Sequence, residues 1–259
     1  MSRIEKAFRE KAFVAFLTAG DPTMEKSEEY IGRLIDGGAD VIEIGIPFSD
    51  PIAEGPVIQS ANVRALQAGA DLPKIFTLVE NVRKKYPETP IVFLTYLNPV
   101  YKYGPENFFK KCSEISADGI IVPDMPFEEK GEISGAAAKY GIDIISLIAP
   151  TSEDRIKLIA QEAQGYIYIV SSMGVTGMRS EIKTDISSIV EAVRRYSDKP
   201  AAVGFGINTP EQAAKFSSIA DGVIVGSAIV KIIERLGENA GDELYAYARK
   251  MKKACLSAE

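Results

Sequence analysis

Glu43 is the residue of this sequence best placed for acid–base chemistry, because it is an acid inside a short apolar segment with β-strand character. Side chains alternate along a strand, so Val41, Glu43 and Gly45 share one face. Ile42 and Ile44 lie on the other face, where they can pack beneath helices. Apolar surroundings raise the pKa of a carboxyl group, which can then donate a proton near neutral pH. The residues alone leave open a structural role, with the carboxylate bonded to backbone amides or hydroxyls.

Two further acids, Asp50 and Glu54, lie in the loop that follows, together with Pro47, Pro51 and Pro56. Prolines stiffen a loop, and stiff loops often frame a site or a partner surface. The spacing alone is equally compatible with an ordinary turn at Asp50 and a solvent-facing acid at Glu54.

The absence of histidine from all 259 residues limits the available chemistry. It excludes Ser-His-Asp and Cys-His triads and histidine-ligated zinc or iron. The two cysteines, Cys112 and Cys255, are too few for a disulfide framework or a four-thiolate site, and Cys112 has the spacing of a buried structural thiol. We therefore expect no metal, and catalysis by carboxylates, lysines, tyrosines, hydroxyls or backbone amides.

Three glycine-bearing segments, at residues 171–177, 204–208 and 226–228, predict a phosphate site. Each follows or ends a predicted strand. Glycines let backbone N–H groups approach an anion, and the N-terminus of a helix favours negative charge. Ser227 can add a hydroxyl. We expect a small phosphorylated substrate that reaches from this site to Glu43, although each segment alone is also compatible with a simple turn.

Short apolar strands alternate with amphipathic helical segments along the whole chain, which predicts an α/β fold of the (β/α)8 TIM-barrel type. The eight strands are expected near residues 13–17, 41–45, 91–95, 119–122, 142–147, 166–170, 201–204 and 222–225. A doubly wound open sheet is the alternative. Against it, residues 18–22 read Thr-Ala-Gly-Asp-Pro, where that fold would carry a Gly-x-Gly-x-x-Gly motif.

The two ends of the chain are expected to be helical. An extra N-terminal helix at residues 4–9 can close the bottom of the barrel, and an amphipathic helix is expected at residues 244–253. No linker or change of composition divides the sequence, so residues 1–259 are expected to form a single domain.

The composition excludes several classes of protein. The chain is 46% hydrophobic and 25% charged, with a formal net charge of −6 and no long basic block, so we expect no nucleic acid partner. No apolar run approaches the roughly 20 residues of a membrane span, and the first residues lack the apolar core of a signal peptide. We expect a cytoplasmic protein that does not bind membranes.

Several features, taken in their order along the chain, closely resemble the alpha subunit of tryptophan synthase. They are Glu43, the loop at 47–59, and the glycine-bearing segments 174–177, 204–206 and 226–230. The stretch Ile-Gly-Ile-Pro-Phe-Ser-Asp-Pro at 44–51 is highly specific for that family, and the resemblance covers essentially the whole chain. It implies retro-aldol cleavage of indole-3-glycerol phosphate to indole and glyceraldehyde 3-phosphate, without a cofactor. It also implies a beta subunit as partner, in an allosteric alpha2beta2 heterotetramer.

The resemblance implies a role for each matching residue. Glu43 would protonate indole C3 and help to deprotonate the glycerol hydroxyl. The second family carboxylate, usually aspartate, falls at Glu54 and would stabilise positive charge at the indole N–H. The extra methylene of Glu54 matters, because a displacement near 1 Å can cost on the order of 100-fold in rate unless the loop compensates. Thr176 lies in the loop expected to close over the substrate and bond the second carboxylate.

The other matching positions fall into four groups. Phosphate contacts match Gly177, Gly206, Gly226 and Ser227. The indole pocket matches Phe16, Leu94, Tyr168 and Phe205. Positions facing the beta subunit match Pro47, Asp50 and Pro51. Supporting polar positions match Tyr96, Asn98 and Asp124.

The residue inventory agrees with this chemistry. A Schiff-base aldolase needs a lysine in the barrel lumen and metal aldolases generally need histidine, but an indole ring protonated at C3 accepts electrons itself. Two alternatives stay open. One is another phosphate-binding barrel enzyme of the same pathway, which would need a lumen lysine or a different acid–base pair. The other is a weakly active barrel that serves mainly as an allosteric subunit, which Glu54 keeps open.

Overall fold

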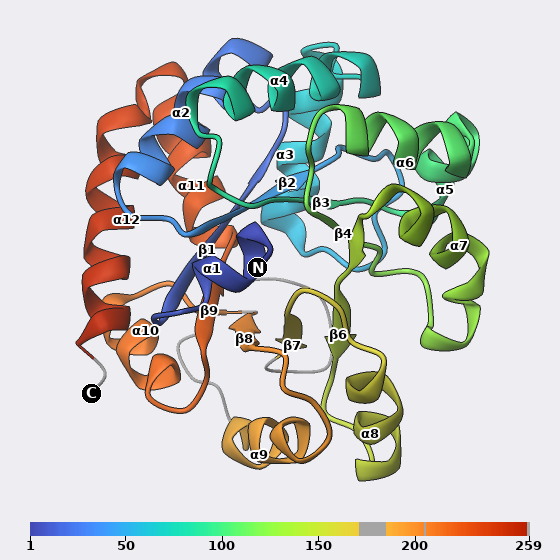
Figure 1. Ribbon diagram of the computed structural model, residues 1–259. Helices are drawn as coiled ribbons and strands as arrows, with labels where there is room; N and C mark the ends of the chain where they lie inside the picture. The colour runs from blue at the N-terminus through green and yellow to red at the C-terminus, as the bar shows by residue number, and fades with distance from the viewer. Residues whose placement is uncertain (171–184, 205, 258–259) are drawn as a thin grey trace.

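The computed structural model describes residues 1–170, 185–204 and 206–257 (Figure 1). In these residues, parallel strands form one sheet in the order β5-β4-β3-β2-β1-β9-β8-β7-β6. The strands are β1 (Ala12–Thr18), β2 (Val41–Gly45), β3 (Ile91–Leu94), β4 (Gly119–Ile121), β5 (Asp143–Ile144), β6 (Ser146–Ile148), β7 (Ile167–Val170), β8 (Ala201–Gly204) and β9 (Gly222–Val225).

The predicted fifth strand is divided into β5 and β6, which are separated only by Ile145. β5 pairs with β4, and β6 pairs with β7. The Ile145 N–H still donates to the Ile120 carbonyl at 2.9 Å, after which the chain changes its partner strand. The two short strands β5 and β6 therefore together occupy the place of the fifth strand in a nearly closed eight-stranded barrel. The predicted barrel is confirmed, and the open-sheet alternative is wrong.

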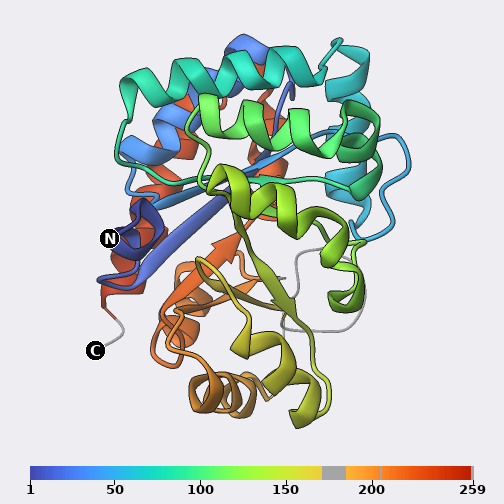
Figure 2. The same cartoon turned by 45° about the vertical axis from the view of Figure 1, so that its right-hand side comes forward.

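Helices surround the ring of strands, apart from α1, which lies across one end of the ring (Figure 1 and Figure 2). They are α1 (Arg3–Ala7), α2 (Met24–Asp36), α3 (Pro56–Gln67), α4 (Leu72–Lys85), α5 (Leu97–Tyr103), α6 (Pro105–Glu114), α7 (Gly131–Tyr140), α8 (Glu153–Gln161), α9 (Ile186–Tyr196), α10 (Pro210–Ser217), α11 (Ser227–Leu236) and α12 (Gly241–Leu256), with 3-10 turns η1 (Phe127–Glu129) and η2 (Gly237–Asn239). α12 contains the predicted C-terminal helix. In the described part of the chain, no helix is both long and apolar enough to cross a membrane.

Local sequence explains where several helices begin. The side chains of Thr23 and Asp71 accept hydrogen bonds from the backbone amides of Lys26 and Lys74, which caps α2 and α4. Thr209 forms a capping box at the start of α10. Such caps satisfy amides that have no partner inside the helix.

Most apolar side chains of the strands belong to one of two cores. Outward residues such as Phe13, Ile42 and Ile44 pack beneath the helices, in a cluster that also contains Cys112. Inward residues such as Val41 form a separate cluster in the lumen. The predicted alternation along residues 41–45 and the predicted burial of Cys112 are thus confirmed.

The short helix α1 closes one end of the barrel. Its Ile4 is buried within the lumen cluster, and the ring of Phe8, just beyond the helix, lies 5.3 Å from that of Tyr166, centroid to centroid. The predicted N-terminal helix is therefore confirmed. Because this end is filled, the open space of the barrel lies at the other end, where the strands finish.

Candidate active site

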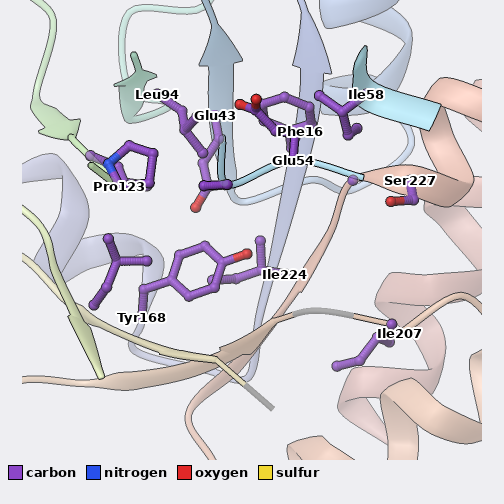
Figure 3. Close-up of a pocket in the computed structure, with 15 residues that line it drawn as sticks. Phe16, Glu43, Glu54, Ile58, Leu94, Pro123, Tyr168, Ile207, Ile224 and Ser227 are labelled. Atoms are coloured by element: carbon purple, nitrogen blue, oxygen red, sulfur yellow. The ribbon is translucent and has the colours of Figure 1, made fainter. Parts of the chain in front are cut away.

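A cavity of about 690 Å³, measured with its open mouth, lies at the C-terminal ends of the strands (Figure 3). Its walls are largely apolar, with few polar groups, as is usual for small-molecule sites. It is lined by Phe16, Glu43, Ala53, Glu54, Ile58, Leu94, Ile121, Pro123, Leu147, Tyr168, Gly206, Ile207, Ile224, Gly226 and Ser227. Eight site residues predicted from the sequence thus meet here: Phe16, Glu43, Glu54, Leu94, Tyr168, Gly206, Gly226 and Ser227.

Glu43 lies in the middle of β2 and points into this cavity on the side of Tyr168 (Figure 3). The residue is only 1% exposed. The Tyr166 hydroxyl donates a hydrogen bond to Glu43 Oε1 at 2.6 Å. Burial raises the pKa of Glu43 from its ordinary 4.5 to about 7, although the Tyr166 hydrogen bond opposes this rise. The predicted upward shift is confirmed, and the carboxyl can both give and take a proton near neutral pH.

The raised pKa predicts that Glu43 destabilises the folded protein at alkaline pH. The folded state keeps the Glu43 proton up to about pH 7, whereas the unfolded chain loses it near 4.5. Stability is therefore lost as the pH rises between these values, by about 3 kcal/mol in total. Glu43→Gln removes this cost, so we expect the variant to be more stable than the parent by about that amount at pH 8 and equal to it near pH 4. Urea unfolding at both values measures this, and a difference independent of pH would contradict it.

Glu54 lies two residues before the first residue of α3 and is also buried, with 6% exposed. The Tyr96 hydroxyl donates to Glu54 Oε2 at 2.6 Å and accepts the Ala53 N–H at 2.8 Å. Burial raises the pKa of Glu54, the Tyr96 hydrogen bond lowers it, and the nearby charge of Asp124 raises it further. The interpretation of Glu54 as a solvent-facing acid is therefore wrong.

Two of the predicted supporting residues, Tyr96 and Asp124, lie close to Glu54. Tyr96 precedes the first residue of α5, and Asp124 accepts the N–H of Leu97 at 3.0 Å. A carboxylate at a helix N-terminus is a favourable arrangement. The third predicted residue, Asn98, is exposed. The structure thus gives Tyr96 and Asp124, rather than Asn98, a visible part in placing Glu54.

The predicted phosphate segments are described only in part. Gly206 and Gly226 line the cavity beside Ser227, which begins α11. Gly206 has φ of +94°, a conformation that favours glycine. A Cβ on Gly226 would lie 3.0 Å from Phe16 Cδ1, so glycine leaves room for that ring. Three other predicted contacts, Thr176, Gly177 and Phe205, lie outside the described residues.

The loop after β2 has a buried base and an exposed tip. Pro47 is buried, Pro51 is partly buried, and Asp50 is exposed. The Ser49 hydroxyl donates to Asp50 Oδ2 at 2.5 Å, and Ile52 is 73% exposed. Of the three positions predicted to face a partner, only Asp50 and Pro51 reach this surface.

Sequence reasoning missed Tyr166, the hydrogen-bond partner of Glu43. It also missed the apolar wall residues Ile58, Ile121, Pro123, Leu147, Ile207 and Ile224. A signal for Tyr166 was present, because it lies two residues before Tyr168 and therefore on the same face of one strand. Nothing in the local sequence pairs it with Glu43, which is 123 residues away.

Together, these features define a TIM-barrel enzyme, because two buried carboxylates line a cavity at the C-terminal ends of the strands, where such barrels carry their active sites. The particular family is shown by comparison. The family model described as "Tryptophan synthase alpha chain" matches residues 3–256. The chain belongs to this family, and its role is that of an alpha chain in tryptophan biosynthesis.

Individual relatives agree along nearly the whole chain. The tryptophan synthase alpha chain of Lacticaseibacillus casei is 46% identical over 255 residues, which cover 98% of this chain and 96% of the relative. Among solved structures, the alpha subunit of Legionella pneumophila strain Paris has a TM-score of 0.91 at 37% identity and covers all of both chains. A chain of the tryptophan synthase a2b2 complex from Pyrococcus furiosus has a TM-score of 0.85 at 36% identity, covering 93% of this chain and 97% of that one.

Proposed function

We propose that this chain cleaves indole-3-glycerol phosphate to indole and D-glyceraldehyde 3-phosphate, with Glu43 as the general acid–base. The observation that carries the proposal is a buried carboxyl with a pKa of about 7 inside an apolar cavity. A flat heteroaromatic ring suits such walls. The second buried acid, Glu54, lies in the same cavity and supplies the negative charge that a cationic intermediate needs.

The reaction can be written with one proton donor that is later a proton acceptor. Glu43 gives its proton to indole C3, which places a positive charge on the ring nitrogen. Glu54 stabilises that charge at the indole N–H. The bond from C3 to the glycerol carbon then breaks, its electron pair returns to the ring, and the glycerol hydroxyl becomes an aldehyde as its proton passes to Glu43. A pKa near 7 suits both steps, because neither protonation state is costly at neutral pH.

Substrate contacts are proposed along the two ends of the cavity. The indole would lie among Phe16, Leu94, Tyr168 and Phe205. The phosphate would bind Gly177, Gly206, Gly226 and Ser227. In support of the phosphate position, α11 begins at Ser227 and has no acidic residue in its first turn. The helix N-terminus therefore offers backbone N–H groups and a favourable dipole. Thr176 would bond Glu54 when substrate is bound.

Tyr96 is proposed to fix the longer Glu54 side chain in place. Tyr96→Phe removes the 2.6 Å hydrogen bond, so the Glu54 carboxylate gains freedom and its pKa rises. We expect kcat to fall about 10- to 100-fold, since small displacements of catalytic groups have effects of this size. Steady-state kinetics measure it. Tyr101→Phe is the matched control, because Tyr101 bonds an exposed glutamate, Glu132, away from the cavity. Equal kinetics in the two variants would contradict the role of Tyr96.

A beta subunit is proposed as the partner, in an alpha2beta2 assembly. The proposal is supported by the Pyrococcus furiosus relative, which is described as a tryptophan synthase a2b2 complex. The loop that carries Pro47, Asp50 and Pro51 would face this subunit through its exposed tip. We further infer that residues 1–259 form one domain, that no cofactor takes part, and that the protein works in the cytoplasm, as suits a biosynthetic enzyme.

Turnover of indole-3-glycerol phosphate by the purified chain tests the proposed function. Indole release should be measured with and without the beta subunit, beside the Glu43→Gln variant. Release by the parent chain and its loss in the variant are expected. A parent rate at background even with the partner would instead favour a subunit that acts mainly on its partner's activity.

A further inference from the structure

The loop after β1, residues 19–22, has a distinctive sequence that the proposed reaction does not use. Its Asp21 is only 1% exposed, which is unusual for a charged residue without a partner. The partner is Arg64 of α3. Arg64 Nε donates to Asp21 Oδ1 and Nη2 to Asp21 Oδ2, both at 2.8 Å. This two-pronged contact fixes both the distance and the angle between the loop and the helix.

The same guanidinium reaches a third element. Arg64 Nη1 lies 3.3 Å from Oε1 of Glu234, which belongs to α11. The loop packs against the same part of α3 through its backbone, because a Cβ on Gly20 would lie 3.4 Å from the Cβ of Ala65. Arg64 therefore ties the β1 loop, α3 and α11 together at one point.

The two helices that Arg64 links, α3 and α11, both begin beside the cavity. Glu54 precedes α3 by two residues, and α11 starts at Ser227. Arg64 is eight positions along α3 from its first residue, and Glu234 is seven positions along α11 from Ser227. At 1.5 Å per residue, Arg64 and Glu234 therefore lie about 10 to 12 Å along their helices from the first residues.

A small apolar cluster lies between the Arg64 contacts and the cavity. It contains Ile58 and Ala61 of α3, Val230 of α11 and Phe16 of β1. Ile58 and Phe16 also line the cavity. Apolar packing is not directional, so it permits α3 to tilt on α11, whereas the bidentate pair resists such a tilt. Motion at the Arg64 end would move the other end of α3, where Glu54 lies.

We propose that the Asp21–Arg64 pair is a positioning device that sets the separation between Glu54 and the start of α11. It would thereby match the cavity to a substrate that must reach both ends at once. This inference rests on the proposed function, because it takes Glu54 and Ser227 as contacts for opposite ends of one substrate. Neither Asp21 nor Arg64 lines the cavity, so their effect passes through Glu54 and Ser227.

The test compares a ligand that spans the cavity with ligands that occupy one end. Arg64→Lys keeps a positive charge beside Asp21 but loses the planar two-pronged contact. We expect kcat/KM for indole-3-glycerol phosphate to fall about tenfold or more, because both ends no longer fit together. The Kd values of indole alone and of glycerol 3-phosphate alone should change by less than about threefold, since each needs only one end. Titration calorimetry and steady-state assays measure these quantities.

Controls separate positioning from general damage. Arg33→Lys alters a comparable but exposed pair, Arg33 with Asp242, between α2 and α12, and should change none of these values. If Arg64→Lys does not fold, Asp21→Asn with Arg64→Gln leaves no unpaired buried charge and is measured in its place. Equal losses for the substrate and both single-end ligands would overturn the proposal, as would an unchanged kcat/KM. A parent chain that binds no glycerol 3-phosphate would instead refute the phosphate site of the proposed function.

Discussion

Glu43→Gln is expected to lower kcat by about 100- to 10,000-fold while KM for indole-3-glycerol phosphate changes little. Glutamine has nearly the same shape as glutamate, and its carbonyl oxygen can still accept the hydrogen bond from Tyr166. It cannot give a proton to indole C3 or take one from the glycerol hydroxyl. The cavity is therefore preserved and only the proton transfer is lost.

Steady-state kinetics across pH provide the measurement. For the parent chain, kcat/KM should change near pH 7, where the Glu43 carboxyl of the free enzyme titrates, and this inflection should be missing in Glu43→Gln. Glu80→Gln is a suitable control, since Glu80 bonds Lys111 at the surface. A Glu43→Gln variant that keeps more than about a tenth of the parent kcat would refute the assignment. A large loss of kcat in Glu43→Gln, together with the expected gain in its stability at pH 8, would show that Glu43 lowers the stability of the fold but is needed for activity.

Gly226→Asp is expected to weaken binding of glycerol 3-phosphate by about 100-fold or more. The new carboxylate would lie at the start of α11, beside the proposed phosphate. Two like charges about 4 Å apart repel by roughly 4 kcal/mol at an effective dielectric constant of 20, which exceeds a 100-fold effect. The added Cβ also comes within 3.0 Å of Phe16 Cδ1, so bulk contributes as well as charge.

Gly226→Ala separates these two causes, because it adds the Cβ without the charge. We expect its effect on the Kd of glycerol 3-phosphate to be about tenfold smaller than that of Gly226→Asp. Binding of indole alone should be nearly unchanged in Gly226→Ala, apart from what a shifted Phe16 ring costs. An unchanged Kd for glycerol 3-phosphate in Gly226→Asp would remove the phosphate from this helix terminus.

Much of the barrel could be predicted because its signals are local. Alternation along residues 41–45 placed Glu43 in the lumen, and the surrounding apolar residues indicated a raised pKa; both are confirmed. The number of strand positions around the barrel, eight, was also predictable from the spacing of the apolar segments along the chain. The division of the fifth strand at Ile145 was not, because it depends on which neighbour the chain pairs with at each height of the barrel.

The sequence by itself therefore determined the fold class, the inward direction of the main acid, and the limits on its chemistry that follow from the lack of histidine. Only the tertiary structure decided the partners of the acids: Tyr166 for Glu43, Tyr96 for Glu54 and Arg64 for Asp21. The physical reason is range. Alternation and capping act between residues a few positions apart, whereas these hydrogen bonds join residues 42 or more positions apart, which meet only when the ring of strands is assembled.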